Sequence, residues 1–339
     1  MRAVGLYRYL PIEDEESLQD LECDCPVANG RDLLVEVKAI SVNPVDTKVR
    51  APKDKVEETP LILGWDAAGV VVAVGDEVTG FEVGDKVYYA GDITRSGSNA
   101  EFQLVDERIV GCKPSSLSFE AAAAMPLTTI TAWEALFNRL KVSETGLDAG
   151  RTILIIGGAG GVGSIAIQLA KRVAKLTVIA TASRPETVAW CEQLGANVVV
   201  NHRSNLADEV GQAGYESVDY VLCLNNTDGH WKAMTEVVKP QGILCSIVEN
   251  KQPLDMSLMK RKSAGLVWEF MFTRSMYQTK DRVEQQTLLN RVGCLIDEGI
   301  VKTTCRRVVT PIDAENLRAV HGQIESGQTI GKIVLAGWS

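Results

Sequence analysis

The chain has 339 residues, of which 45% are apolar and 23% charged, and its 35 Lys and Arg against 44 Asp and Glu leave a net charge of -9. This composition excludes a disordered, fibrous or membrane-embedded chain, and the length predicts two domains. The negative charge, with no run of Lys or Arg, argues against nucleic acid as a partner. An anionic cofactor would therefore need local backbone N–H groups and a few placed cations.

The N-terminal segment predicts a soluble, cytoplasmic protein. Charged residues from Glu13 to Glu16 interrupt it before the apolar region of a secretion signal could form. No stretch approaches the roughly 20 apolar residues that a membrane-spanning helix needs, so a membrane is not an expected partner. The eight cysteines are scattered along the chain, which indicates reduced thiols.

The first third of the chain reads as β-rich. Short β-branched or aromatic runs at residues 33–40, 69–74 and 86–89 are separated by Gly-Asp turns. After residue 118 the pattern changes to Ala-rich and predicts helices, with Ser118 as a cap.

From residue 151 to about residue 248 the predicted strands and helices alternate. The expected strands are residues 152–156, 176–180, 198–200, 218–224 and 242–248, and the expected helices are residues 163–173, 186–194 and 231–238. Alternation of this kind favours a parallel sheet covered by helices. The tail returns to mixed character, with a helix from Asp313 between strands near residues 308–309 and 332–335. The sequence thus predicts a nucleotide-binding domain inserted into a discontinuous catalytic domain.

A glycine-rich turn lies between the first strand and the first helix of this alternating region. The segment GGAGGVG at residues 157–163 contains the spacing G-x-G-x-x-G, formed by Gly158, Gly160 and Gly163. Glycines at these positions allow a tight turn, close approach of a pyrophosphate and close helix packing, and the helix N-terminus faces the anion. We therefore expect residues 158–163 to bind a dinucleotide, which includes Ala159, Gly161 and Val162.

The choice between NAD and NADP depends on the end of the next strand. An acidic residue there would bind the ribose 2′-hydroxyl and repel a 2′-phosphate, whereas this chain has Ser183 and Arg184. Because Arg can bind phosphate through two parallel hydrogen bonds, NADPH is the expected cofactor. The alternative is that Ser183 and Arg184 only cap the following helix. His202 could also flank the adenosine phosphate, although a surface loop explains it about as well. Asn225 and Asn226 follow a later strand at the ligand-binding edge of such a sheet.

Several segments together resemble the medium-chain dehydrogenase/reductase superfamily over nearly the whole chain. They are SVNPVD at residues 41–46, GWDAAGVVVAVG at residues 64–75, VGDKV at residues 83–87, the glycine turn, and GKIVL at residues 331–335. The resemblance implies an α/β fold in which a Rossmann doubly wound parallel sheet domain (residues 125–270) is inserted into a GroES-like β-rich catalytic domain (residues 1–124 and 271–339).

The departures from the zinc-containing members point to a zinc-free branch. The positions of their zinc ligands hold Asn43, Trp65, Asp66 and, as the third ligand position, Leu127 here. A tetrahedral zinc site needs Cys, His or carboxylate ligands, so no catalytic metal is expected. The region of the structural zinc lobe, residues 88–101, contains no cysteine. The chain therefore resembles the quinone oxidoreductase-like and enoyl reductase-like proteins, within a subgroup often labelled zinc-type alcohol dehydrogenase-like.

The resemblance implies hydride transfer from NADPH to an electron-poor acceptor, a quinone or an α,β-unsaturated carbonyl compound. Asn43, Asp46 and Thr131 are the expected catalytic residues, and Lys332 resembles a lysine near the cofactor. Trp65 and Trp268 are the aromatic side chains expected in the pocket for this small electrophilic substrate. Asp46 could equally fix the following turn.

Two alternatives remain open at this point. One is a zinc-dependent alcohol dehydrogenase, and the other is a non-catalytic NADPH-binding protein. The family resemblance also implies a homodimer, in which the nucleotide domains of many relatives pair through an edge strand.

Overall fold

The computed structural model describes residues 1–338 and divides into two compact units. Unit 1 consists of Met1–Ile130 together with Phe272–Ser339, and unit 2 consists of Thr131–Met271. The expected domains, residues 1–124 with 271–339 and residues 125–270, differ from these bounds by a few residues. The reason is that helix α3 (Pro126–Trp133) begins in unit 1 and ends in unit 2.

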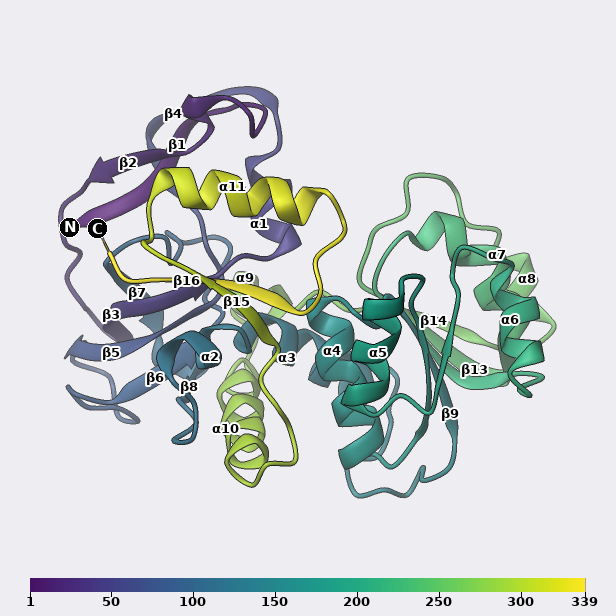
Figure 1. The fold of residues 1–339 in the computed structure, drawn as a ribbon. Helices are drawn as coiled ribbons and strands as arrows, with labels where there is room; N and C mark the ends of the chain where they lie inside the picture. The colour runs from purple at the N-terminus through teal and green to yellow at the C-terminus, as the bar shows by residue number, and fades with distance from the viewer. Residues whose placement is uncertain (339) are drawn as a thin grey trace. The chain divides into compact units, whose positions relative to one another are not determined.

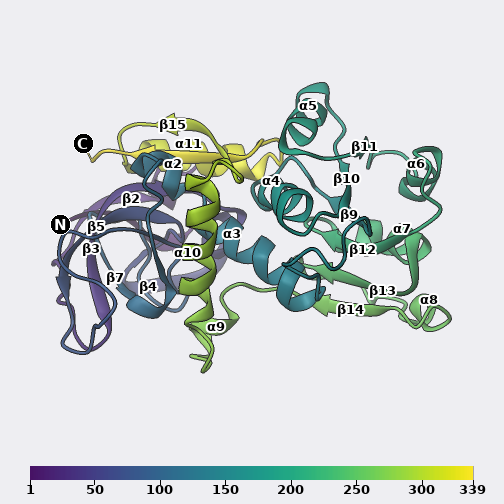
Figure 2. The same cartoon turned by 90° about the horizontal axis from the view of Figure 1, so that it is seen from below.

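Unit 2 contains a six-stranded parallel sheet (Figures 1 and 2). Its strands lie in the order β11-β10-β9-β12-β13-β14, and every neighbouring pair is parallel. Their bounds are β9 (Thr152–Ile156), β10 (Thr177–Thr181), β11 (Val198–Val200), β12 (Val218–Cys223), β13 (Val238–Ser246) and β14 (Gly265–Trp268). The chain runs outward from β9 to β11 and then returns beside β9 as β12, which confirms the doubly wound sheet expected from the sequence.

The helical segments of unit 2 alternate with these strands. They are the π-helices η3 (Glu134–Arg139) and η4 (Leu169–Val173), and the helices α4 (Gly161–Gln168), α5 (Pro185–Leu194), α6 (Leu206–Gln212), α7 (Thr227–Val237) and α8 (Ser257–Lys260). Helix α7 begins four residues before its expected start at Trp231 because Asn226, at φ 43°, accepts a hydrogen bond from the Gly229 N–H at 3.1 Å. Strand β14 was not predicted, since a four-residue run carries too little pattern to be distinguished from a loop.

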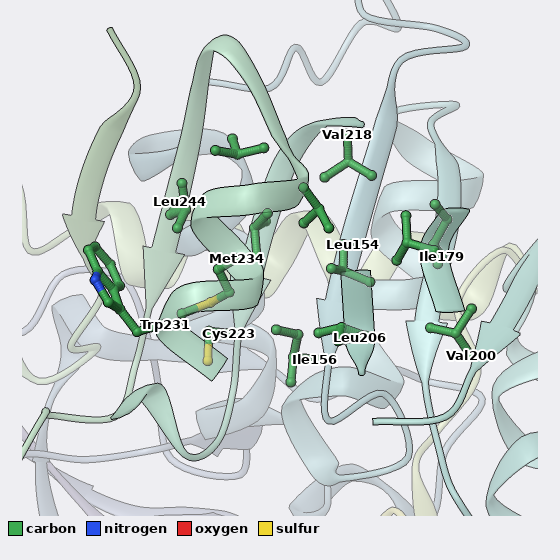
Figure 3. Close-up of a cluster of buried hydrophobic side chains, with 14 of the residues drawn as sticks. Leu154, Ile156, Ile179, Val200, Leu206, Val218, Cys223, Trp231, Met234 and Leu244 are labelled. Atoms are coloured by element: carbon green, nitrogen blue, oxygen red, sulfur yellow. The ribbon is translucent and has the colours of Figure 1, made fainter. Parts of the chain in front are cut away.

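A large apolar cluster fixes one face of this sheet (Figure 3). Leu154, Val221 and Leu244 from central strands pack there with Met234 of α7 and Leu206 of α6, and each of these side chains is at most 2% exposed. All five residues of β9 are buried, as expected for a central parallel strand that is covered on both faces. The core therefore holds rigid the strand that carries the glycine turn at its end.

Unit 1 is built around two sheets. Its strands are β1 (Arg2–Tyr9), β2 (Gln19–Glu22), β3 (Asp32–Ser41), β4 (Lys53–Ile62), β5 (Ala67–Val74), β6 (Lys86–Tyr89), β7 (Phe102–Asp106), β8 (Val110–Cys112), β15 (Cys305–Val309) and β16 (Lys332–Ala336). The smaller sheet has the order β2-β1-β4, and the larger has the order β15-β16-β3-β5-β6-β8 with β7 also paired to β3. The C-terminal strand β16 is thus hydrogen-bonded to β3 from the first third of the chain, which confirms the discontinuous domain.

Helices cover and join these sheets. They are the 3-10 helices η1 (Glu15–Ser17) and η2 (Glu107–Ile109), and the helices α1 (Pro44–Arg50), α2 (Phe119–Ala123), α9 (Thr273–Met276), α10 (Glu284–Asp297) and α11 (Ala314–Glu325). Helix α10 is tied to the larger sheet by the Tyr88 hydroxyl, which donates to the Leu289 carbonyl at 2.6 Å. Helix α2 begins at the expected cap, Ser118, and α11 begins after Asp313, where a helix start was expected; both side chains accept backbone hydrogen bonds as N-caps. Among residues 1–338, no helix is long and apolar enough to span a membrane.

Helix α11 buries a histidine whose replacement is expected to improve stability in acid. His321 is 0% exposed, and neither ring nitrogen has a hydrogen-bond partner among residues 1–338. Burial, together with the nearby positive charge of Arg50, lowers the pKa of His321 to about 3. Because the unfolded chain binds this proton near pH 6.5, stability is full above that pH and falls as the pH drops toward 3.

The free energy of unfolding of the parent protein should fall when the pH is lowered from 7 to 5. We expect this fall to be about 2 kcal/mol smaller in His321→Leu. Urea titrations at both pH values measure this difference. An equal loss in the two proteins would show that His321 does not titrate differently in the folded state.

Candidate functional site

The glycine turn at the end of β9 has the geometry of a phosphate-binding loop. Gly157 has φ 89°, a conformation open to glycine, and Gly160 is the N-cap of α4 with φ -71° and ψ 175°. Two hydrogen bonds anchor the turn to Thr181 at the end of β10. The Gly157 N–H donates to the Thr181 hydroxyl at 3.0 Å, and the Gly158 N–H donates to the Thr181 carbonyl at 3.1 Å. The N-terminus of α4 is thereby held directly beyond the end of β9.

The other two glycines of the motif are required by close packing. A Cβ atom on Gly158 would lie 2.9 Å from the Ala180 side chain, and one on Gly163 would lie 2.4 Å from the Gly157 carbonyl oxygen. On Gly160, in contrast, the nearest atom would be the Gly157 oxygen at 3.6 Å. Glycine at position 160 is therefore not required by the protein's own packing. In the G-x-G-x-x-G motif, glycine at this position lets the pyrophosphate of a dinucleotide approach the backbone.

Ser183 and Arg184 lie between β10 and α5, on the loop beside the glycine turn. Arg184 is the N-cap of α5, where its backbone N–H donates to the Thr187 hydroxyl at 3.0 Å. Its guanidinium forms a 3.1 Å ion pair with Glu186, and the two side chains are 27% and 56% exposed. An ion pair this exposed contributes little to stability.

Three further residues predicted for the cofactor, Asn225, Asn226 and His202, follow strands β12 and β11 at the same carboxyl edge of the sheet. A Cβ atom on Gly157 would lie 3.5 Å from the Asn225 amide nitrogen, so Asn225 borders the turn. Asn226 caps α7 through its side chain. His202 follows β11 and lies edge-on to His230, with ring centroids 6.4 Å apart, and burial lowers the pKa of both histidines.

Lys332 of unit 1 is the centre of a buried polar network. Its side chain is 4% exposed, and its ammonium donates to the Val42 carbonyl at 3.0 Å, to Asn43 Oδ1 at 2.5 Å and to Asp66 Oδ2 at 3.0 Å. An ammonium group has three hydrogens, so these contacts use all of them. Lys332 was predicted as a cofactor contact, whereas the structure engages its donors entirely within unit 1.

Asp66 and Asn43 complete this network. Asp66 is 0% exposed, and its Oδ1 accepts from the Leu127 N–H at 2.8 Å while its Oδ2 accepts from Asn43 Nδ2 at 2.8 Å as well as from Lys332. The second hydrogen of the Asn43 amide has only a long contact, 3.4 Å, to the Ser41 carbonyl. Burial raises the pKa of Asp66, and the Lys332 charge and the Leu127 N–H oppose that shift.

Asp46 lies at the start of α1, next to this network. Its Oδ2 accepts from the Asn43 N–H at 2.5 Å, which closes the first turn of the helix, so the turn-fixing role is present. Its Oδ1 is buried with no hydrogen-bond partner among residues 1–338. Burial raises the pKa of Asp46 to about 7, and the charge of Lys332 limits the shift.

The predicted aromatic pocket residues differ in exposure. Trp65 is 1% exposed, donates to the Asp92 carbonyl at 3.3 Å and packs edge-on against Phe272. Trp268 ends β14 and is 43% exposed. Thr131 of α3 is 5% exposed. Trp65 therefore packs as a core side chain of unit 1, whereas Trp268 is accessible on unit 2.

The residues of the network do not offer a zinc site. Catalytic zinc needs three protein ligands that converge on one point and leave a fourth position open. Among residues 1–338, no group of three or more His, Cys, Asp or Glu side chains could hold a metal ion. Asp66 is the one acidic side chain at the four positions compared above, and both of its oxygens already accept hydrogen bonds, one of them from a cation.

Asp66 was expected only to occupy a former zinc-ligand position, and its ion pair with Lys332 was not predicted. Strand register gives the signal that would have found the pair. In the antiparallel pairing of β16 with β3, Val334 lies opposite Ser41, so Lys332 falls opposite Asn43. The Ser41 N–H in turn donates to the Asp66 carbonyl at 3.1 Å, which brings Asp66 to the same place.

Two family models and several known proteins match this chain. The family model described as "Alcohol dehydrogenase GroES-like domain" matches residues 29–126, and the one described as "Zinc-binding dehydrogenase" matches residues 194–335. The chain is 40% identical over 337 residues to a zinc-type alcohol dehydrogenase-like protein of Staphylococcus epidermidis, with 99% of each chain covered. It is 33% identical over 234 residues, 64% of this chain and 58% of the other, to a chloroplastic NADPH-dependent alkenal/one oxidoreductase of Arabidopsis thaliana.

Two solved structures are similar to this chain over nearly its whole length. A putative zinc-dependent alcohol dehydrogenase protein from Rhizobium etli is 49% identical, with a TM-score of 0.96 and coverage of 100% of this chain and 98% of the other. Escherichia coli quinone oxidoreductase complexed with NADPH shares the fold at 23% identity, with a TM-score of 0.81 and coverage of 99% and 100%. The chain is therefore an oxidoreductase of the medium-chain dehydrogenase/reductase superfamily and belongs to its zinc-type alcohol dehydrogenase-like family.

Proposed function

We propose that this oxidoreductase transfers hydride from NADPH to a quinone or an α,β-unsaturated carbonyl compound without catalytic zinc. The observation that carries the proposal is the 3.0 Å ion pair between Lys332 and Asp66. Asp66 is the one acidic side chain among the four positions that correspond to zinc ligands in the zinc-containing relatives, and the ion pair engages it. Without a metal to polarise a ketone or alcohol oxygen, an acceptor that is already electron-poor is the easier substrate. The name of the alkenal/one oxidoreductase relative supports the same acceptor class and the same cofactor.

Unit 2 supplies the cofactor site in this proposal. Bound NADPH supplies the hydride. The backbone at Gly160, Gly161 and Val162 would hold the pyrophosphate, since the N–H groups at the start of α4 have no partner within the helix. Ser183 and Arg184 would hold the 2′-phosphate, and Asn225 would border the turn. His202 would lie at the outer end of the same edge.

Arg184→Ala is expected to raise the KM for NADPH about tenfold or more and to leave the KM for NADH unchanged. A charge-assisted hydrogen bond to phosphate contributes about 1.5–3 kcal/mol, and NADH has no 2′-phosphate to lose it. Initial-rate kinetics with each cofactor measure the two values.

Glu186→Gln is the matched control for this substitution, because it releases the same guanidinium from its ion pair without removing it. NADPH binding should then be kept or strengthened. Equal losses with both cofactors in Arg184→Ala would assign Arg184 to helix capping alone.

Unit 1 supplies the polar groups for the acceptor. In this proposal the loosely held second amide hydrogen of Asn43 donates to the acceptor oxygen as that oxygen gains negative charge. Asp46 contributes a buried carboxyl whose Oδ1 has no other partner among residues 1–338. Thr131 is proposed to contact the nicotinamide and Trp268 the acceptor, and we place the reaction in the cytoplasm.

The decisive test is turnover with a panel of quinones, enals and simple aldehydes after dialysis against a chelator, followed as oxidation of NADPH and of NADH. Turnover of quinones or enals that prefers NADPH and ignores the chelator is the expected result. Activity restricted to simple aldehydes and abolished by the chelator would instead identify a zinc-dependent alcohol dehydrogenase. Tight NADPH binding without any turnover would identify a non-catalytic binding protein.

We also propose that the protein is a homodimer joined through β14. This strand ends the sheet order of unit 2, and Phe270, two residues beyond the strand, is 46% exposed. Pairing with a second copy would satisfy the hydrogen-bonding groups of the edge strand and cover the Phe270 ring. Light scattering should give twice the chain mass of 36.8 kDa, and Phe270→Glu should give the single mass. A parent protein of single mass would contradict the dimer.

A further inference from the structure

The ammonium of Lys332 is coordinated as a bound ion would be. Three oxygens surround it, from the Val42 carbonyl, the Asn43 carboxamide and the Asp66 carboxylate, at 3.0, 2.5 and 3.0 Å. A buried charge is tolerated only when its hydrogen bonds are made and a countercharge is near. Lys332 meets both conditions, so the fold holds its ammonium group at this position of unit 1.

The strand register makes this placement a property of the fold. Lys332 is the first residue of β16, and the pairing of β16 with β3 places it opposite Asn43. The main chain of Asp66 is bonded to Ser41 on the other side of β3. Three separate segments of the chain therefore meet at the ammonium.

The same cation decides which way the Asn43 carboxamide points. An ammonium can only donate and a carboxylate can only accept, so Asn43 Oδ1 must face Lys332 and Nδ2 must face Asp66. The observed contacts, 2.5 Å for Oδ1 and 2.8 Å for Nδ2, have this polarity. Without the ammonium, the Asp66 carboxylate would still favour this orientation, but Asn43 Oδ1 would lose the donor that Lys332 supplies.

We propose that Lys332 is a built-in cation that replaces a metal ion at this centre: its ammonium orients the Asn43 carboxamide, neutralises Asp66 and closes the centre to divalent cations. Lys332 is thus a positioning residue rather than a cofactor ligand. The effect on turnover rests on the proposed function, whereas the effects on metal content and stability do not.

The test uses chemical rescue in the full-length protein. Lys332→Ala removes the ammonium and three methylenes, and n-propylammonium carries the missing atoms. We expect Lys332→Ala to lower kcat about 10–100-fold, as loss of a group that orients a site residue does, with the dissociation constant for NADPH unchanged. Propylammonium should restore part of the turnover and raise the Tm of this variant but not of the parent. Tetramethylammonium, which has the charge but no N–H donor, should do neither.

Two further variants keep the test decisive. Lys332→Met fills most of the space of the lysine side chain without the charge, so it should lose turnover as Lys332→Ala does and should not respond to propylammonium. Lys55→Ala removes a lysine of the same unit whose side chain is 57% exposed and should change nothing. Metal analysis of the chelator-dialysed parent protein should find no zinc.

Four results would overturn the proposal. They are about one zinc per parent chain, Lys332→Met with the kcat of the parent, a weaker NADPH affinity with unchanged kcat in Lys332→Ala, and a Tm of Lys332→Ala that does not respond to propylammonium. If the parent turns over no acceptor, the proposed function fails. The Tm response and the metal content still decide the role of Lys332 in that case.

Discussion

Replacing Gly160 with alanine should weaken cofactor binding about tenfold or more while leaving the fold intact. The position has φ -71°, which alanine adopts freely, and the added Cβ would meet nothing in the protein closer than the Gly157 oxygen at 3.6 Å. The pyrophosphate of a dinucleotide would occupy the same space. We expect the dissociation constant for NADPH to rise by about tenfold or more, equivalent to about 1.4 kcal/mol. Fluorescence titration measures the affinity, and thermal unfolding measures the stability.

Two other glycines give matched controls for this prediction. In Gly163→Ala the new Cβ would lie 2.4 Å from the Gly157 oxygen, so the turn must open and both stability and binding should fall. In Gly211→Ala, within α6, no atom lies within 4 Å of the new Cβ, so both should be kept. If Gly160→Ala bound NADPH as tightly as the parent, the pyrophosphate would not lie on this turn.

Removal of the Asp66 carboxylate should be the most destabilising single change in unit 1. Asp66→Ala leaves the Lys332 ammonium buried beside only two neutral acceptors and leaves the Leu127 N–H without its partner. Breaking a buried ion pair on one side costs about 3–5 kcal/mol, because an uncompensated charge remains. Urea titration should show a loss of that size in the free energy of unfolding.

A double variant separates the contribution of the Lys332–Asp66 ion pair to the free energy of unfolding from that of the surrounding packing. Asp66→Leu combined with Lys332→Met removes both charges together, and apolar replacement of a whole ion pair is often close to neutral. We therefore expect the double variant to be more stable than Asp66→Ala. If Asp66→Ala lowered the free energy of unfolding by less than about 1 kcal/mol, water would be hydrogen-bonded to the Lys332 ammonium in place of Asp66. The network would then be accessible to water.

The fold of unit 2 could be predicted because its signals are local. An apolar strand, a glycine turn and a following helix are contiguous in the chain, and the alternation of strands with helices leaves a parallel sheet as the natural arrangement. Glycine at position 163 is needed within its own turn, whatever lies farther away. The starts of α2 and α11 were likewise marked by Ser118 and Asp313, since a cap acts on its own helix.

Lys332 was recognised from the sequence as a candidate site residue, but the residues that it contacts could not be predicted. Asn43 and Lys332 are 289 residues apart, and Asp66 and Lys332 are 266 apart. Sequence reasoning could list Asn43 and Asp46 as site residues and could note that the compared positions lack zinc ligands. It could not show that the Lys332 ammonium lies where relatives with zinc ligands would hold a metal ion.

The sequence by itself thus determined the two-part organisation, the doubly wound sheet and the glycine turn, because each depends on neighbouring residues and on the periodicity of burial. Tertiary structure alone decided that Lys332, Asn43 and Asp66 meet, that Trp65 is buried and that Trp268 is exposed. The physical reason is strand pairing: the register of β16 on β3 and of β3 on β5 brings distant residues to one point, and a shift of one residue would turn each side chain to the opposite face.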